Sequence, residues 1–426
     1  MWLTLLAAAA ILPTDTGTAR RDTASTLPQV TLSGEVRTRS ELEHLVAAPR
    51  ADALTYLRTR LGARATIGDA VRLVVGVQDS RVLGTQAHAN AASTLDLHEG
   101  YLEIIRPLHG ARLALRAGRQ EIALGNERLI GRVNWSNVGQ AFDGLRLTAA
   151  PSGGRMPWSA TAFAVTRIER GTVTESDLHL YGASATRALP GAGGTGELTL
   201  LHDRGVHARG REVTARTTVA ARVHGVPLLG LRADLEGAVQ RGAEHALPTS
   251  TAPLGPRETI RAWMLGARLG TPVGTAAAPR RVTALAGLDV LSGDVSKTDR
   301  RDGAFSTLFA TNHPFYGTED VIAGDPAASL GGRGLVDAFT SVTYAAARTL
   351  SLRADLHRLA TARPRGLSDG LLGWEADVAA PYRVLPGATI EAGYAAFRAG
   401  DAGTALGLGR AGHVRGWGYL QLTAGF

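Results

Sequence analysis

The sequence predicts an all-β protein that forms one transmembrane antiparallel β-barrel of about 18 strands. Three observations predict it: apolar and polar residues alternate along most of the chain, short and long connections alternate between these segments, and the chain ends on the alternating segment LQLTAGF, whose last residue is Phe426. Because successive side chains of a strand point to opposite faces, alternation gives each segment one apolar and one polar face. Such a wall separates lipid from a water-filled interior.

The alternation is clear where Leu57 and Leu61 are interleaved with Arg58, Arg60 and Arg64. In the fourth segment the alternation changes parity near Glu99, which indicates a β-bulge. The predicted strands are residues 29–40, 54–67, 70–83, 95–106, 111–120, 142–150, 158–168, 177–187, 196–204, 211–224, 227–240, 258–271, 281–292, 334–346, 348–360, 369–380, 387–398 and 412–426.

The connections support one orientation in a bacterial outer membrane. If both termini are periplasmic, every long connection falls on the outer side, and the turns between them are short, as in outer-membrane barrels. We therefore expect a barrel over residues 28–426 in the outer membrane of a Gram-negative bacterium, with 293–333 as a long extracellular loop. The long connections are residues 41–53, 84–94, 121–141, 241–257, 293–333 and 399–411.

Composition is compatible with this reading. The 426 residues are 44% hydrophobic, yet beyond the N-terminus no apolar run approaches the ~20 residues that a membrane helix needs. A soluble β-sandwich would also alternate, but the number and length of the strands favour the barrel. Cysteine is absent, which excludes disulfides and zinc–thiolate sites.

Residues 1–19 are interpreted as a signal peptide. The apolar run 2–12 has the length of a signal-peptide core, and Gly17, Thr18 and Ala19 are small residues suited to cleavage. The positively charged segment that normally precedes the core is missing, and a disordered tail is the alternative.

The most distinctive motif is GRQEIALGNERLIGRVNWSNVGQAFDG, residues 118–144. Its elements GRQE, GNERLIG, NWSN and AFDG, with HPFYG at 313–317, resemble the signature of the alginate-export family of outer-membrane porins. The resemblance implies an 18-stranded monomeric barrel surrounded by lipid. Members of that family also occur where no alginate is made, so the resemblance does not fix the substrate.

Arginines are the candidate residues of a substrate path. A guanidinium stays charged at any working pH and binds carboxylates through two hydrogen bonds, and rings of such residues are a known selectivity device. Polar lumens also use arginines structurally, so only the whole set supports an anion path. By parity the inward candidates are Arg58, Arg60, Arg64, Arg112, Arg116, Arg146, Arg216, Arg222, Arg232 and Arg353, and the motif adds Arg119, Arg128 and Arg132.

Three acids on the same inward parity, Asp234, Glu236 and Asp355, are expected to pair with some of these arginines. The polar segment 121–141 is expected to fold into the pore and narrow it. Within and beside that segment, Trp135 is interpreted as packing the loop rather than stacking on a sugar. Asn134, Asn137 and Asp143 are expected to hold its turns through backbone groups.

Other function classes are disfavoured. No nucleophile elbow, HExxH or phosphate loop occurs, so neither an enzyme nor a cofactor is expected. The net charge of +8 suggests an anionic partner, but the basic residues are spread singly, which argues against nucleic acid. No metal site is expected. A calcium site among loop acids is a weaker reading than a solvated acidic loop; the acids are Asp299, Asp302, Glu319, Asp320 and Asp325.

Two functions follow. The first is a passive, anion-selective outer-membrane channel for an alginate-like acidic polysaccharide or for smaller organic anions, with the direction of flow left to the gradient and to periplasmic export partners. The alternative is a surface-binding or structural barrel with a closed lumen, whose segment 293–333 contacts a partner.

Overall fold

The computed structural model describes residues 28–43, 52–83, 93–153, 157–167, 177–191, 193–206, 212–245, 255–272 and 281–426. The predicted signal peptide at 1–19 lies outside them. Eighteen long strands form the wall: β1 Gln29–Glu43, β2 Asp52–Ile67, β3 Val71–Leu83, β4 Ser93–Leu108, β5 Ala111–Gln120, β6 Phe142–Pro151, β7 Trp158–Arg167, β8 Asp177–Leu189, β9 Gly194–Val206, β10 Glu212–Leu228, β11 Leu231–His245, β12 Arg257–Gly270, β13 Val282–Leu291, β15 Leu335–Ala345, β16 Ser351–Ala360, β17 Leu371–Leu385, β18 Ala388–Ala399 and β19 Val414–Gly425.

Three short elements lie in the long connections. The two-residue strand β14 (Arg301–Asp302) runs parallel to β12. Helices α1 (Pro326–Ser329) and α2 (Asp401–Ala405) are single turns. Among the described residues, no helix combines the length and the apolar character that a membrane span requires.

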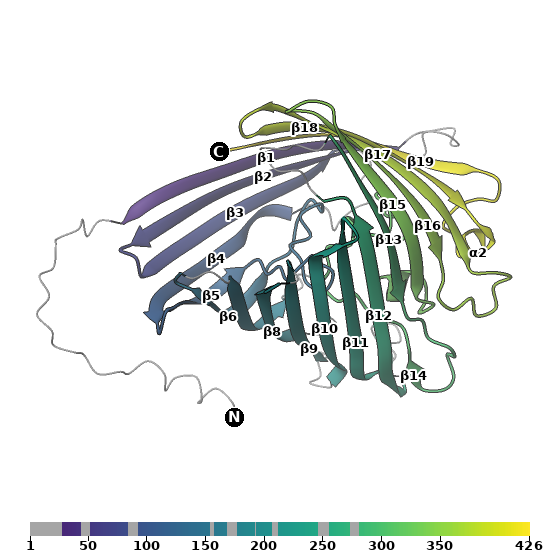
Figure 1. Ribbon diagram of the computed structural model, residues 1–426, viewed down its shortest axis with the longest axis horizontal. Helices are drawn as coiled ribbons and strands as arrows, with labels where there is room; N and C mark the ends of the chain where they lie inside the picture. Colours follow the sequence, from purple (N-terminus) through teal and green to yellow (C-terminus); the bar gives the residue numbers. More distant parts are fainter. Residues whose placement is uncertain are drawn as a thin grey trace, which may run out of the picture.

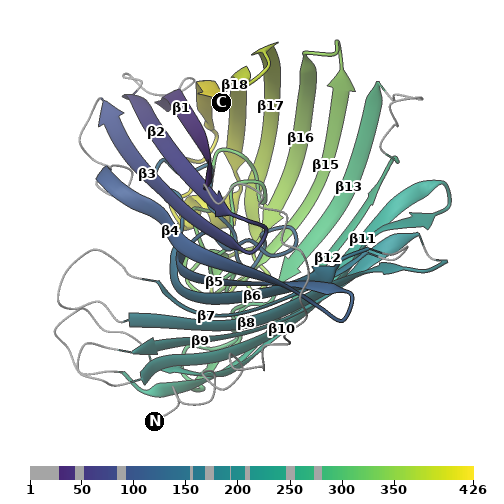
Figure 2. The ribbon, with the colours of Figure 1, turned by 90° about the vertical axis from the view of Figure 1, so that its left-hand side faces the viewer.

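The sheet closes on itself. Each long strand pairs antiparallel with the next, so that the strands follow one another around the barrel (Figures 1 and 2). The first strand, β1, pairs with the last, β19, where Glu35 lies opposite Gly425. The C-terminal residue takes part in the closure, because Phe426 and Gly34 exchange two backbone hydrogen bonds of 3.0 and 3.2 Å. The predicted closed antiparallel barrel of 18 strands is confirmed.

The irregularity predicted in the fourth strand is present. Gly76 of β3 pairs with Glu99 of β4, but the next residue, Val77, pairs with Leu97, so His98 has no partner in the ladder. A bulge of this kind adds one residue to one strand and changes the face to which later side chains point. The parity change seen in the sequence is therefore a real feature of the wall.

The outward face is apolar. Large aliphatic side chains at outward positions are exposed on successive strands, among them Leu61, Leu73, Leu102, Leu115 and Leu147. In water such a surface would be costly, because each exposed apolar Å² raises the free energy by about 25 cal/mol. Around an outer-membrane barrel it is the band that faces the acyl chains.

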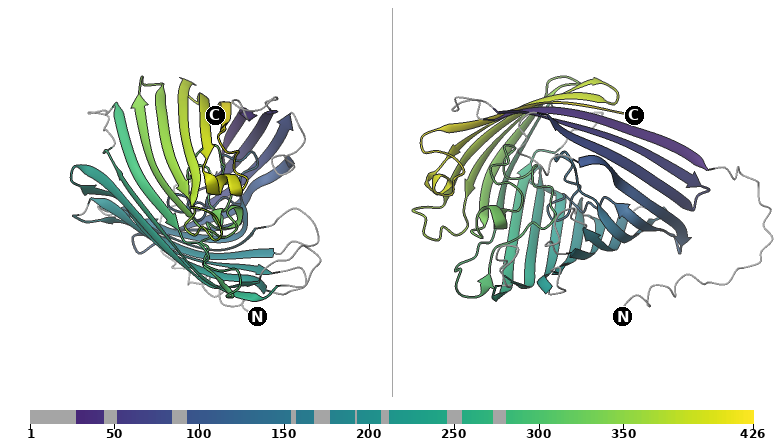
Figure 3. Two further views of the ribbon diagram at one scale, coloured as in Figure 1. Left: turned by 90° about the vertical axis from the view of Figure 1, so that its right-hand side faces the viewer. Right: turned by 180° about the vertical axis from the view of Figure 1, so that it is seen from behind.

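The interior holds an apolar core of its own. Residues 121–141 (the motif loop) and 293–333 (the long loop) leave the wall at the same end of the barrel and turn inward, where their traces are seen inside the ring of strands (Figure 3). Leu129 and Gly131 form backbone hydrogen bonds of 3.0 and 2.9 Å with Phe309. Around this contact, side chains from both loops pack with inward side chains of the wall; they include Ile122, Ile130, Phe305, Phe142, Phe163, Leu180, Leu201 and Met264.

Arg128 ties the two loops to the wall at the centre of this core. Its side chain is 1% exposed, and it donates hydrogen bonds to Asp289 Oδ2 of β13 (2.7 Å) and to the hydroxyl of Tyr316 in the long loop (2.9 Å). Its Nε lies 3.2 Å from Glu236 Oε2 of β11, and the guanidinium lies 4.0 Å from the ring centroid of Phe315. Burial by itself lowers the pKa of Arg128, but Tyr316 and the two carboxylates raise it overall, so the group stays charged.

Replacing Arg128 by leucine is expected to destabilise the protein by about 3–5 kcal/mol, because the buried Glu236 would lose its ion-pair partner and the buried Asp289 would be left with Arg268 at 3.0 Å. Equilibrium unfolding by urea in phospholipid vesicles measures this change. Arg132→Gln is the matched control: Arg132 lies on the same loop, is half exposed, and has Glu127 as its one ion-pair partner among the described residues, so a change under about 1 kcal/mol is expected. Equal effects of the two substitutions would contradict the role given to Arg128.

Candidate functional site

The inner wall has three unlike sectors. Inward side chains of β7–β13 are largely covered by the interior core, as in Leu180, Leu201 and Ala262, which are 1%, 0% and 0% exposed. The inward positions of β1–β6 carry charged and polar side chains instead. The inward positions of β15–β17 carry acids that are buried, since Asp337, Glu375 and Asp377 are 1%, 0% and 3% exposed. Most of the accessible positive charge of the interior therefore lies on β1–β6, which makes this sector the candidate site.

Arginines of β1 and β2 hold the motif loop against this sector. Arg37 donates to the carbonyl oxygens of Asn134 (2.6 Å) and Ser136 (3.0 Å), and Arg58 donates to the same two oxygens at 3.1 and 3.2 Å. Arg39 donates to the carbonyl oxygen of Trp135 at 2.7 Å. Arg37, Arg39 and Arg58 are 4%, 3% and 1% exposed. They donate to backbone carbonyl oxygens of the loop that have no partner in the β-sheet. We call Arg37, Arg39 and Arg58 the arginine clamp.

Side chains of β2 and β3 extend this contact. The amide of Gln78 donates to the carbonyl oxygen of Val138 (2.6 Å), and the hydroxyl of Ser80 donates to that of Asn137 (2.8 Å). Asn137 donates in return to the carbonyl oxygen of Arg81 at 3.1 Å. Arg60 donates to the side-chain oxygen of Asn134 at 3.2 Å. Asn134 and Asn137 thus join the loop to the wall, beyond the turn-holding role expected of them.

Trp135 has both faces of its ring covered. The guanidinium of Arg39 lies 3.8 Å from the ring centroid, and the imidazole of His313 in the long loop stacks on it at 3.9 Å with an interplanar angle of 4°. Tyr419 and Trp417 of β19 approach its edge. This ring packs the two loops together and offers no free face to a sugar.

The first residue of the motif loop, Glu121, is part of a charged cluster. His98, the bulged residue of β4, lies 2.8 Å from Glu121 Oε1, and Arg60 lies 3.6 Å away. Burial raises the pKa of Glu121, but the hydrogen bond and charge of His98 and the charge of Arg60 outweigh it, so the pKa is lowered. Glu121 therefore stays ionised and anchors the start of the loop.

Below the clamp, towards the end of the barrel with short turns, arginines lie on neighbouring strands of the same sector. They are Arg64 of β2, Arg72 of β3, Arg112 and Arg116 of β5 and Arg146 of β6, and together we call them the basic stripe. Glu103 of β4 pairs with Arg72 (3.0 Å) and Arg116 (2.8 Å). Within the described residues, Arg64, Arg112 and Arg146 have no carboxylate within ion-pair distance.

The other predicted arginines differ in their surroundings. Arg222 pairs with Asp234 at 3.4 Å and Arg353 with Asp355 at 2.8 Å, while Glu236 pairs with Arg128, so each of the three expected acids has an arginine partner. Arg216 lies 3.4 Å from Glu244. Arg232 donates to the turn carbonyl of Gly225 at 2.8 Å. Arg222, Arg353, Arg216 and Arg232 thus bind groups of the wall itself, as structural arginines do.

Arg119 faces the other way. It pairs in register with Gly100 and Asp143, one residue before the buried Gln120, so alternation places it on the outward face of β5 with Leu115. Its guanidinium binds Asp143 at 2.7 Å. The prediction that Arg119 lies on the substrate path is therefore wrong. It was based on the motif, whereas the alternation along β5 places Arg119 on the outward face. Asp143 likewise serves this outward ion pair rather than a loop turn.

On β1–β6, three inward arginines were missed by the sequence prediction: Arg37, Arg39 and Arg72. All three lie in predicted strands, opposite in parity to Val30, Leu32 and Val36 on β1 or to Leu73 on β3. The alternation that identified Arg58 and Arg64 as inward residues would therefore also have identified Arg37, Arg39 and Arg72. Arg268 of β12, which binds Asp289 at 3.0 Å, was missed as well.

The loop acids considered for calcium have protein partners. Asp325 caps α1 and accepts a hydrogen bond from Ser306, and Asp320 binds His313 at 2.9 Å. Glu319 pairs with Arg415 at 2.5 Å. In the described part of the chain, no three His, Asp or Glu side chains converge in a way that could hold a metal ion.

Solved structures of similar fold are outer-membrane porins. The chain is similar to OccK2 of Pseudomonas aeruginosa in complex with glucuronate, with 13% identity and a TM-score of 0.57 over 93% of this chain and 98% of that chain. It is also similar to a BenF-like porin of Pseudomonas fluorescens Pf-5, with 11% identity and a TM-score of 0.60 over 94% and 99% of the two chains. A third similar structure is OccAB1 of Acinetobacter baumannii, with 13% identity and a TM-score of 0.60 over 93% of this chain and 96% of that chain. No match was found among curated proteins.

The family is shown by sequence. The family model described as alginate export matches residues 29–413, which include the whole motif loop, the arginine clamp and the basic stripe. The fold and the family are those of a channel of the Gram-negative outer membrane, not of an enzyme, as predicted. The chain belongs to the alginate-export family of outer-membrane porins.

Proposed function

We propose that this channel is anion-selective and passes acidic saccharides of the alginate type, or smaller organic anions. The observation that carries the proposal is the basic stripe: one carboxylate, Glu103, pairs with two of its arginines, while Arg64, Arg112 and Arg146 have no ion-pair partner among the described residues. These three side chains supply positive charge that the wall itself does not neutralise.

Unpaired charge in a pore acts more strongly than charge on an open surface. The wall and the apolar core have a low dielectric constant, so the field of the arginines is less screened there than in bulk water. Anions are then concentrated beside the stripe and cations are depleted. Arg72 and Arg116, which both donate hydrogen bonds to Glu103, lie beside these three arginines and add further N–H donors to the stripe.

The geometry suits a ligand with repeated carboxylates. Neighbouring strands are about 4.8 Å apart, so arginines on β2, β3, β5 and β6 present their guanidinium groups across the wall as a row of separate sites. Each can bind a carboxylate through two hydrogen bonds. The similar barrel OccK2 has been solved with glucuronate, a sugar acid, which supports a barrel of this shape holding such a ligand.

The motif loop directs solutes to this row. It occupies the interior between the clamp on β1 and β2 and Arg128 near β11 and β13, and the interior core fills the wall beyond it. We infer that the loop narrows the channel on the outer side of the basic stripe, so that the stripe lies on the remaining path.

Replacing Arg64, Arg112 and Arg146 together by glutamine is expected to abolish anion preference. The reversal potential of the purified protein in a planar bilayer under a KCl gradient should indicate anion preference for the wild type. It should move to about zero selectivity for the triple variant, because the three arginines without a carboxylate partner are gone and Glu103 is shared by the remaining Arg72 and Arg116. Arg106→Gln, an outward arginine of β4, is the control and should leave the reversal potential unchanged. A cation-preferring wild type would contradict the proposal.

Oligouronates are expected to block the wild-type current reversibly, because their carboxylates would bind along the stripe while they cross. The measurement is single-channel current with added oligouronate, with a neutral oligosaccharide of equal length as the control. Block should weaken by about tenfold or more in the triple variant, since each charged hydrogen bond contributes about 1.5–3 kcal/mol. Anion preference without block would leave a channel for small anions only.

A further inference from the structure

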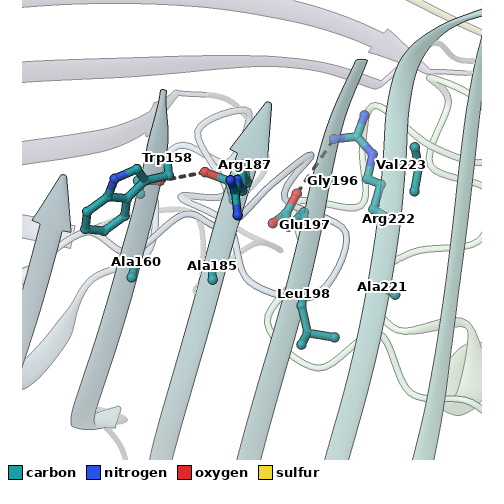
Figure 4. A pocket seen from close by; sticks show the side chains of 12 residues that line it. Trp158, Ala160, Ala185, Arg187, Gly196, Glu197, Leu198, Ala221, Arg222 and Val223 are labelled. Atoms are coloured by element: carbon teal, nitrogen blue, oxygen red, sulfur yellow. Dashed lines mark hydrogen bonds and ion pairs between the residues drawn. The ribbon is translucent and has the colours of Figure 1, made fainter. Parts of the chain in front are cut away.

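A groove lies on the outer surface of the barrel across β7, β8, β9 and β10 (Figure 4). It has a volume of about 680 Å³, within the range of small-molecule sites. Two rows of side chains border it, Trp158, Arg187, Gly196 and Val223 in one and Ala160, Ala185, Leu198 and Ala221 in the other.

Strand register shows that the groove faces away from the pore. On the same four strands, Phe163, Leu180, Leu201 and Ala220 point inward and pack in the interior core. Alternation from each of them places both rows on the opposite face. Leu198, which is 59% exposed, agrees with this assignment.

The groove lies near the end of the barrel with short turns. Trp158 is the first residue of β7, and Gly196 is the third residue of β9. In an outer-membrane barrel the short turns are periplasmic, so the groove opens to the periplasmic leaflet, which places it close to the headgroup level. Trp158 suits that depth, because tryptophan is enriched at the membrane interface.

Arg187 gives the groove a specific charge. It is exposed, it lies beside Trp158 in register, and its side chain has no hydrogen-bond or ion-pair partner within the described residues. An arginine on a lipid-facing surface extends its guanidinium towards the interface, where it binds phosphate through two hydrogen bonds. The other side chains of the two rows are apolar or small, which suits an acyl chain. The four lining residues between the rows, Ser159, Thr186, Glu197 and Arg222, turn their side chains inward by alternation.

We propose that this groove binds one phospholipid of the periplasmic leaflet, with its phosphate on Arg187 and an acyl chain over Ala160, Ala185 and Ala221. The site rests on the position of the barrel in the outer membrane and is independent of what the channel transports. Its ligand would fix the depth and tilt of this part of the wall.

Fluorescence quenching by brominated lipid tests the site. The purified protein is titrated in detergent micelles with a phosphatidylglycerol that carries bromines on one acyl chain, and the signal of Trp158 is obtained by difference from Trp158→Phe. Arg187→Gln should raise the lipid fraction at half-quenching about tenfold, the loss expected for a hydrogen bond to a charged group. Ala185→Leu, which fills the groove, should have a similar effect.

Two controls make the result decisive. Arg106→Gln and Ala376→Leu change outward residues of β4 and β17 and should leave half-quenching of Trp158 unchanged. A brominated maltoside detergent, which lacks phosphate, should quench Trp158 at the same concentration in wild type and Arg187→Gln. If phospholipid also quenches both proteins equally, the groove has no phosphate site and the proposal is overturned. A dimer in solution that Ala185→Leu dissociates would place a second copy in the groove and would also overturn it.

Discussion

Backbone carried inside a barrel must find hydrogen-bond partners, and in this protein buried arginines supply many of them. The motif loop has no ladder to join at 134–136, so its carbonyl oxygens accept from Arg37, Arg39 and Arg58. On the far side of the barrel Arg128 binds carboxylates of two wall strands and a tyrosine of the long loop. Without these charged donors the loop would leave unsatisfied carbonyls in a poorly solvated interior.

This constraint makes the pore asymmetric. Once the loop is held at both ends, its apolar residues and those of the long loop can pack against β7–β13 and exclude water there. The polar wall of β1–β6 then remains for solutes. The many arginines therefore have two distinct uses. The clamp binds carbonyl oxygens of the motif loop and the carboxylates of Glu35 and Glu41, whereas Arg64, Arg112 and Arg146 have no carboxylate partner among the described residues.

Strand periodicity predicted most of the fold, because alternation is a local property that survives in a single sequence. It located the long strands, the bulge beside Glu99 and the inward parity of Arg58, Arg64 and Arg146. It could not separate their roles. Whether Arg58 faces solvent or a loop carbonyl depends on the path of residues 134–136, which have no period and are placed by partners almost a hundred residues away. Arg119 shows the opposite error, since a motif match without the parity of β5 gave it the wrong face.

The most direct test asks which sector of the interior is open to a charged solute. The chain has no cysteine, so single cysteines can be labelled without background. Ala114 of β5 lies between Arg112 and Arg116 on the inward face, whereas Ala262 of β12 is 0% exposed beneath the interior core. With an anionic methanethiosulfonate reagent, we expect Ala114→Cys to react and the single-channel current to fall, and Ala262→Cys to stay unmodified. An unreactive Ala114→Cys, or equal reaction at both positions, would contradict a path along β1–β6.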